Sequence, residues 1–190
     1  MDRGQDQRLV PMILDVMGQI KKDFSALDRI AITRGPGSFT GLRIGIAAAR
    51  GLGLAANKPV IGIDRFRIYR EQVGKPKNDL FVVIGSKRRE LYCQFFAAQG
   101  LQQEPMMMTE SEITKFLANH SGILVTGDTT VVEAKNFRKP HEMEAITCAA
   151  LAARISDIND PEFLPRPLYV RAPDVTVKNE QKNPVFQSIA

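Results

Sequence analysis

The residues best suited to chemistry form a glycine-rich turn between a short apolar run, residues 30–33, and a helix. The turn contains Gly35, Gly37, Ser38 and Thr40. A glycine turn that opens a helix can present backbone amides to a phosphate group. The spacing lacks the Gly-Lys-Ser/Thr ending of a P-loop and the third glycine of the dinucleotide fingerprint. A phosphate loop and a tight strand-to-helix turn capped by Ser38 or Thr40 both remain open, and the second is the simpler.

The helix that must follow this turn, residues 40–56, carries small residues at four-residue intervals. This ridge consists of Gly41, Gly45, Ala49 and Gly53. Because glycine inside a helix costs roughly 1 kcal/mol relative to alanine, the ridge indicates a close approach of another backbone. The neighbour is either the chain's own sheet or a partner helix. We favour a partner helix, and expect Leu42 to join that contact.

A second helix is expected over residues 5–22, and its apolar stripe is too broad for one neighbour. The stripe includes Leu9, Ile13, Val16 and Ile20. Two helices with spare packing surface in one lobe suggest a helix bundle across a protein–protein contact. The contact would be made with a partner protein or with a second copy of the chain.

The remaining pattern alternates strands and helices. Residues 30–33 and 60–63 predict short buried strands that pair in parallel around helix 40–56. The polar stretch 66–79 predicts a boundary between two lobes, and we expect residues 1–70 in the first. The second lobe, 71–177, is expected to hold a hairpin at 80–84 and 91–97, helix 109–119, strand 123–126 and helix 140–155, before a disordered tail at 178–190.

Side chains for metal or nucleophilic catalysis are sparse. The two histidines, His120 and His141, have no carboxylate or cysteine at ligand spacing, so no metal site is expected. His120 follows a helix end, where it would cap or be solvated. Cys93 and Cys148 lie in apolar surroundings, which indicates buried, reduced thiols.

Composition is that of an ordinary folded protein. Of the 190 residues, 44% are hydrophobic and 25% are charged, with a formal net charge of +5. This mild excess permits transient contact with RNA without indicating an autonomous nucleic-acid binder. Arg43 and Arg50 interrupt the most apolar run and the first ten residues are polar, so we expect a cytoplasmic protein without a membrane span or secretory signal.

One basic cluster is a candidate RNA contact. The expected hairpin turn carries Lys87, Arg88 and Arg89, and residues 135–139 form a second basic segment. Most charged turns are simply solvated, and the alternative is a contact with RNA phosphates.

The block GPGSFTGLRIGIAAARGLGLA, residues 35–55, resembles the TsaB (YeaZ) family of tRNA threonylcarbamoyladenosine biosynthesis proteins, within the M22 or glycoprotease-like group. The similarity extends over residues 1–177. Its other motifs are RGQDQRLVPMIL at 3–14, the strand at 59–63, KRRELYCQFF at 87–96 and PLYVRAPDVT at 167–176.

This resemblance implies a two-lobed α/β fold of the actin-like ATPase (ASKHA, ribonuclease H-like) type. It implies a non-catalytic scaffold that binds the catalytic subunit TsaD through first-lobe helices, with TsaE joining the assembly. tRNA, modified at adenosine 37, would be reached through the complex, and the chain alone would form a homodimer. No cofactor is implied for the chain itself, although ATP or ADP is conceivable at the complex interface.

Departures from the family pattern weigh against two alternative functions, a metal-dependent enzyme and a nucleotide-binding module. In TsaD, the strand equivalent to 60–63 is followed by metal-binding histidines, whereas residues 63–68 contain none. This argues against an M22-type metallopeptidase or transferase. A nucleotide-binding regulatory module is weakened because Ser86 stands where the family often has aspartate.

The family's usual first element is also missing from the sequence. Family members begin with a strand bearing an Asp-Thr-Ser-like turn, then further strands, whereas this sequence starts at the first helix. The first-lobe sheet is therefore expected to be truncated to mainly 30–33 and 60–63, with exposed edges and core.

Overall fold

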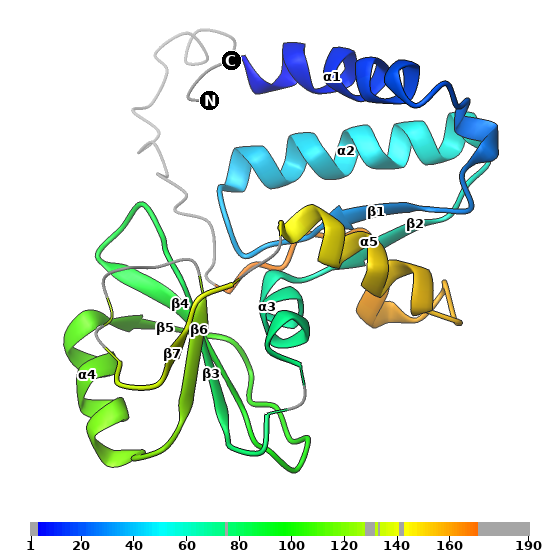
Figure 1. The fold of residues 1–190 in the computed structure, drawn as a ribbon. Coiled ribbons are helices and arrows are strands. Elements are labelled where there is room, and N and C mark those ends of the chain that lie inside the picture. The colour runs from blue at the N-terminus through cyan, green and yellow to red at the C-terminus, as the bar shows by residue number, and fades with distance from the viewer. Residues whose placement is uncertain (1–3, 75, 128–131, 133, 141–142, 171–190) are drawn as a thin grey trace, which may run out of the picture.

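Two β-sheets with flanking helices make up the fold (Figure 1). A computed structural model describes residues 4–74, 76–127, 132, 134–140 and 143–170. The predicted tail at 178–190 lies outside these residues. Within them, no helix is long and apolar enough to cross a membrane.

The first sheet has two parallel strands, β1 (Ile30–Thr33) and β2 (Val60–Ile63), in a register that pairs Ile30 with Val60. Helix α2 (Phe39–Ala56) connects them. Both predicted strands, their parallel pairing and the crossover helix are confirmed. A two-stranded sheet is too small to be stable alone, so it depends on the helices that cover it.

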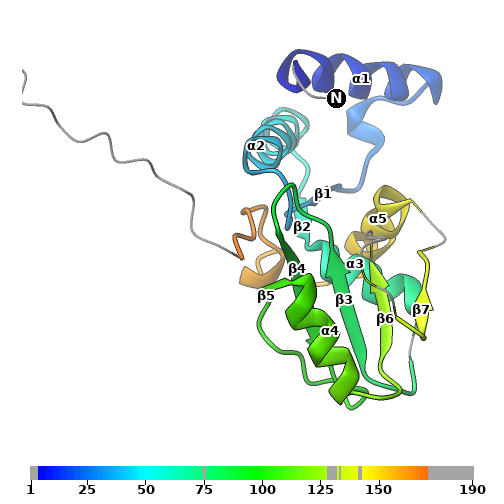
Figure 2. The same cartoon turned by 90° about the vertical axis from the view of Figure 1, so that its left-hand side faces the viewer.

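Three helices build layers around this sheet. α2 packs on one face of β1, and α5 (Glu144–Arg154) packs against β1 and β2 from the other side (Figure 2). α1 (Gln5–Gln19) contacts α2 and lies farther from the sheet than α2 does. α1 is therefore an outer layer supported on one side.

The second sheet is mixed, in the order β5-β4-β3-β6-β7. Its strands are β3 (Leu80–Ile84), β4 (Glu90–Phe96), β5 (Met106–Thr109), β6 (Leu124–Gly127) and β7 (Phe137–Arg138). The predicted hairpin is confirmed as the antiparallel pair β3–β4. All five residues of β3 are buried, because helices cover both faces of this central strand.

Helix α4 (Glu110–Asn119) covers one face of the second sheet. Thr109 begins the helix through a capping box, in which its side chain accepts from the Glu112 amide and the Glu112 carboxylate accepts from the Thr109 amide. The predicted helix at 109–119 is confirmed. A capping box satisfies two amide groups that a helix start otherwise leaves unpaired.

The predicted boundary at 66–79 is instead largely a helix, α3 (Arg65–Val73). Asp64 caps it by accepting from the Arg67 amide at 2.8 Å. Phe66, Tyr69 and Val73 form a buried face against β3. The four charged residues of this short segment hid its apolar periodicity, and the expected domain limit at residue 70 falls inside α3.

The chain returns to the first sheet after completing the second. Cys148 and Ala152 of α5 share one hydrophobic cluster with Ile61 and Ile63 of β2 and with Ile68 of α3. The elements that pack around the first sheet therefore come from both ends of the described chain. The expected division into 1–70 and 71–177 stays a prediction.

Candidate functional site

The glycine turn lies at the end of β1 with its first residues buried. The Gly35 carbonyl accepts from the Arg65 amide at 2.7 Å, and the Pro36 carbonyl accepts from Arg65 Nη1 at 3.2 Å. Ser38 caps α2 by accepting from the Gly41 amide at 3.3 Å, which confirms that predicted role. The turn thus presents carbonyl oxygens to an arginine, and its use as a phosphate loop through Gly37 and Thr40 stays a prediction.

Arg65 connects this turn to α5 through a carboxylate. Arg65 Nε and Nη2 donate to the two Glu144 oxygens at 2.8 and 2.6 Å, and the Tyr69 hydroxyl donates to Glu144 Oε1 at 2.7 Å. The side chains of Arg65 and Glu144 are 17% and 31% exposed. A bidentate pair of this kind fixes both the distance and the orientation of the elements that it joins.

The ionisation of Glu144 follows from these contacts. Burial alone would raise the pKa of its carboxyl, but the hydrogen bonds and charge of Arg65, helped by Tyr69, hold the pKa below its ordinary value. A carboxylate stabilised in its charged form by two partners is a poor general base. We therefore assign Glu144 a structural role.

The thiols and the described histidine are likewise unsuited to nucleophilic or metal chemistry. Burial raises the pKa of Cys93 to about 12, and burial together with the charge of Glu144 raises the pKa of Cys148 to about 11. Both cysteines are buried and free, as predicted. His120 ends α4, with Nδ1 2.7 Å from the Phe116 carbonyl oxygen. Among the described residues, no three His, Cys, Asp or Glu side chains gather in a potential metal site.

The small-residue ridge of α2 faces the chain's own sheet over much of its length. Ala49 is only 5% exposed. A methyl group added at Gly53 would overlap the Val60 side chain and lie 2.9 Å from the Lys58 carbonyl oxygen, and one at Gly45 would contact Ile32 at 3.5 Å. These three positions permit close helix–sheet packing, which was the alternative interpretation of the ridge. Gly41 and Leu42 are half-buried.

Helix α1 carries the largest concentration of exposed apolar side chains in the described chain. They are Val10, Met12, Leu14 and Val16, together with Ile20 at the C-cap. Val16 is 57% exposed and Ile20 is 53% exposed, whereas Leu9 and Ile13 are half-buried. Leu54 of α2 is 86% exposed. Because exposed apolar groups of this size are rarely clustered on a monomer's surface, this cluster is a candidate contact surface.

The basic hairpin turn is exposed, as predicted. Lys87, Arg88 and Arg89 lie between β3 and β4, and the Ser86 hydroxyl accepts from the Arg88 amide at 3.0 Å. Ser86 also donates to the Glu90 carbonyl. Ser86 therefore shapes the turn, and the RNA contact of the three basic residues stays a prediction.

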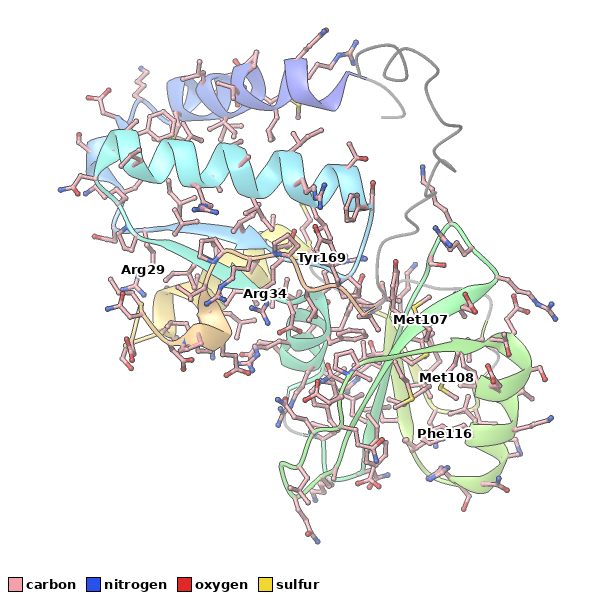
Figure 3. All side chains as sticks on the ribbon, turned by 180° about the vertical axis from the view of Figure 1, so that it is seen from behind. Arg29, Arg34, Met107, Met108, Phe116 and Tyr169 are labelled. Atoms are coloured by element: carbon pink, nitrogen blue, oxygen red, sulfur yellow. The ribbon has the colours of Figure 1, made fainter. Side chains whose placement is uncertain are left out.

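Residues near the end of the described chain pack against the start of α2. Arg43 Nε donates to the Tyr169 hydroxyl at 3.1 Å, and the Arg43 guanidinium lies 3.8 Å from the centre of the Phe39 ring. Arg34 lies near this segment (Figure 3), and its carbonyl accepts from the Leu168 amide at 2.7 Å. The sequence did not predict the contact between Arg43 and Tyr169, because the two residues are 126 positions apart.

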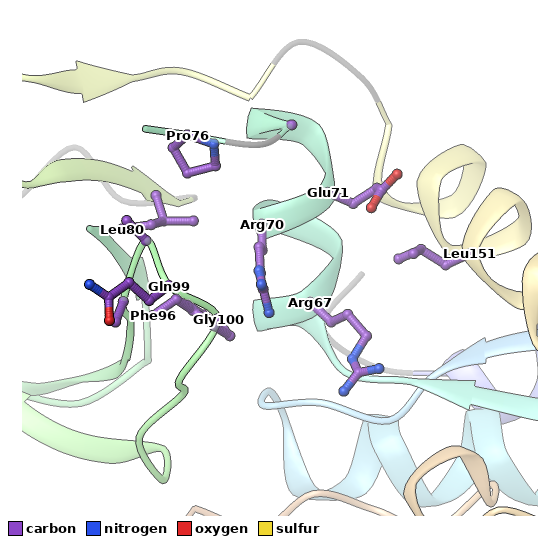
Figure 4. A pocket seen from close by; sticks show the side chains of 12 residues that line it. Arg67, Arg70, Glu71, Pro76, Leu80, Phe96, Gln99, Gly100 and Leu151 are labelled. Carbon is purple, nitrogen blue, oxygen red and sulfur yellow. The ribbon is translucent and has the colours of Figure 1, made fainter. Parts of the chain in front are cut away.

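A cavity of about 510 Å³ lies between α3 and the loop that follows β4 (Figure 4). The Arg70 guanidinium projects there and lies 5.0 Å from the centre of the Phe96 ring. Glu71, also at its wall, accepts from Arg154 Nη2 at 2.6 Å. The cavity contains none of the residues expected to be functional from the sequence.

Comparison with known proteins places the chain in a family. The model of the family described as TsaD, tRNA N6-adenosine threonylcarbamoyltransferase, matches residues 2–110, which is more than half of the chain. The chain belongs to the TsaD family. The match includes the glycine turn, α1, α2 and the basic hairpin.

Two relatives of this TsaD-family chain carry the name tRNA threonylcarbamoyladenosine biosynthesis protein TsaB. The Escherichia coli (strain K12) protein is 44% identical over 61 residues, covering 32% of this chain and 26% of the relative. The Haemophilus influenzae protein is 26% identical over 140 residues, covering 66% of this chain and 59% of the relative. The chain matches less than two thirds of the length of either relative. Because both relatives carry the TsaB name, the resemblance to the TsaB (YeaZ) family is confirmed.

A solved structure supports the fold of this TsaD-family chain. It is a Pseudomonas aeruginosa protein described as similar to peptidase YEAZ, with a TM-score of 0.64 and 23% identity. The similarity covers 90% of this chain and 86% of that one. This similarity and the match to the TsaD family together confirm the predicted α/β fold of the actin-like ATPase type.

Proposed function

We propose that this chain is an accessory subunit in the formation of N6-threonylcarbamoyladenosine at position 37 of tRNA, and that it binds a TsaD-type catalytic subunit. The observation that carries the proposal is the exposed apolar surface of α1 in a chain of this family. Its TsaB-named relatives support the same process. TsaE would join the assembly, and tRNA would reach the chain through the complex.

The contact surface is assigned to the outer side of α1 and the exposed stripe of α2. Val16 lies on α1, Ile20 is the C-cap that directly follows it, and Leu54 lies on α2. Leu9 and Ile13 would contribute to this contact only through the exposed parts of their side chains. Ala49 and Gly53 act indirectly in this assignment, because they hold α2 close to the sheet that supports it.

Chemistry inside the described chain favours an accessory role over a catalytic one. The pKa of each buried thiol is raised, so neither is a thiolate near neutral pH. The Glu144 carboxylate is already held by Arg65 and Tyr69. These groups stabilise the fold, and the catalytic step is assigned to the partner.

Charge placed on the α1 surface should abolish the partner contact. We expect the double variant Val16→Asp/Ile20→Asp to weaken binding by at least about 100-fold, because each buried aliphatic side chain contributes roughly 1.5–3 kcal/mol. Calorimetric titration with a TsaD-type partner measures the dissociation constant. Size-exclusion chromatography with light scattering tests the competing homodimer in the same samples.

The matched control is Leu101→Asp, which adds a charge at a residue that is 75% exposed in the other half of the molecule. It should bind as the unchanged protein does. If circular dichroism shows both proteins to be folded, equal binding by the α1 double variant and the unchanged protein would contradict the proposed interface. Loss of self-association without loss of partner binding would assign α1 to the homodimer instead.

A further inference from the structure

A basic surface groove lies at the end of the second sheet farthest from the hairpin turn. It has a volume of about 650 Å³ and is formed by three separate segments. The polar and aromatic residues that line it are Lys77, Asn78, Asn136, Phe137, Arg138 and Lys139. Among the described residues, none that lines it is acidic.

Hydrogen bonds hold the three segments in place. Asn78 Nδ2 donates to the Gly122 carbonyl at 3.0 Å, and Thr126 Oγ1 donates to the Arg138 carbonyl at 2.8 Å. Arg138 Nη1 donates to the Val73 carbonyl at 3.0 Å, at the C-terminal end of α3. Among the described residues, this one nitrogen anchors the guanidinium, and its remaining donors can face a ligand.

The charges of the groove are not neutralised within the described chain. Lys77 and Lys139 are exposed, and neither forms an ion pair with a described residue. Three cations in one concavity without a carboxylate raise the local concentration of anions. Phe137, on the edge strand β7, is 36% exposed and adds an aromatic face.

We propose that this groove binds tRNA, with Lys77, Arg138 and Lys139 contacting phosphates and Phe137 stacking on an unpaired base. Cations that track the backbone beside an aromatic platform are the features by which proteins hold single-stranded RNA. An anionic membrane would need a broader surface, and an acidic peptide would not need the aromatic face. The inference rests on the function proposed above, which brings tRNA to the assembly.

The groove differs in position from the basic turn considered from the sequence. Lys77 precedes β3, whereas Lys87 follows it, so the two basic regions lie at opposite ends of the central strand (Figure 1). The hairpin turn therefore supplies a control with the same charge change at a different place.

The test measures binding of an unmodified tRNA transcript to the full chain by fluorescence anisotropy, with and without its TsaD-type partner. At roughly 0.1 M salt, Lys77→Glu/Lys139→Glu should weaken binding by about tenfold or more and reduce the salt slope by about two. Phe137→Leu, which keeps an apolar group, should weaken binding by about tenfold without changing the slope. Lys87→Glu/Arg89→Glu should weaken tRNA binding less than the groove double variant does.

Three results would overturn the groove assignment. One is no detectable binding of tRNA by the unchanged protein, alone or with its partner. Another is an equal loss in the groove and hairpin variants, which would show a response to net charge only. The third is preferred binding to vesicles containing anionic phospholipid, or to an acidic peptide, over tRNA.

The modification assay separates this proposal from the proposed function. If the groove double variant binds tRNA normally and supports full modification, the groove assignment fails and the accessory role stands. If the unchanged protein does not support modification by its partner, the accessory role fails whether or not the groove binds RNA.

Discussion

Replacing Gly127 with alanine should destabilise the chain by at least about 4 kcal/mol, enough to remove much of a typical domain's stability. Gly127 ends β6 with a φ of 148° beside β3. An added methyl group would overlap the Val83 carbonyl oxygen and lie 2.7 Å from its carbonyl carbon. Neither backbone can move without breaking the β3–β6 pairing, so the clash cannot be relieved by a side-chain rotation.

Thermal unfolding followed by circular dichroism measures this effect. We expect the Tm of Gly127→Ala to fall by at least roughly 8 °C, or the chain to lose cooperative unfolding. Gly51→Ala is the matched control, because a methyl group there meets no atom within 4 Å and lies within helix α2. It should stabilise the chain by about 0.5–1 kcal/mol. Equal transitions for Gly127→Ala and the unchanged protein would contradict the packing of the second sheet.

Neutralising Glu144 should produce the other large stability effect. We expect Glu144→Gln to cost about 1–3 kcal/mol near neutral pH, because Arg65 loses its charged partner in a partly buried setting. Tyr69→Phe removes the hydroxyl that donates to Glu144 and accepts from Arg65 Nη2 at 3.2 Å, and should cost about 1 kcal/mol because both charged groups keep each other as partners. Denaturant unfolding gives both differences, and a cost for Glu144→Gln smaller than that for Tyr69→Phe would contradict the network.

The same carboxylate predicts a pH dependence. Because the pKa of Glu144 is lowered in the folded state, its contribution is fully present above the unfolded value of ~4.3. The contribution is lost as the pH falls below this value and through the lowered folded pKa. The difference in unfolding free energy between the unchanged protein and Glu144→Gln should therefore shrink in acid. A difference that is constant from neutral pH to strong acid would show that Glu144 does not titrate in this way.

Local signals were sufficient for most of the fold. Two helix starts and one buried strand depend only on residues that lie within a few positions of one another. They are the start of α2 at Ser38, the start of α4 at Thr109 and Glu112, and the apolar run of β3. α3 was missed because its charges outweighed the spacing of Phe66 and Tyr69 in a polar segment. β7 is only two residues long, and a strand of that length has no periodicity to detect.

The candidate site was less accessible to sequence reasoning. The spacing of Gly45 and Gly53 correctly indicates close packing, but spacing alone does not identify the neighbour, which the structure shows to be β1 and β2. The Arg65–Glu144 pair joins residues 79 positions apart. Long-range partners of this kind are fixed by topology, since α5 returns to the first sheet only after the second is complete.

Reconstituted tRNA modification is the most direct test of the accessory role. Unmodified tRNA is incubated with threonylcarbamoyl adenylate, a TsaD-type subunit and TsaE, with or without this chain, and N6-threonylcarbamoyladenosine is measured by mass spectrometry of the nucleosides. We predict that the modified nucleoside forms when this chain accompanies its partner, that Val16→Asp/Ile20→Asp abolishes the stimulation, and that the chain alone forms none. Formation by the chain alone, or equal formation by the partner without it, would contradict the account.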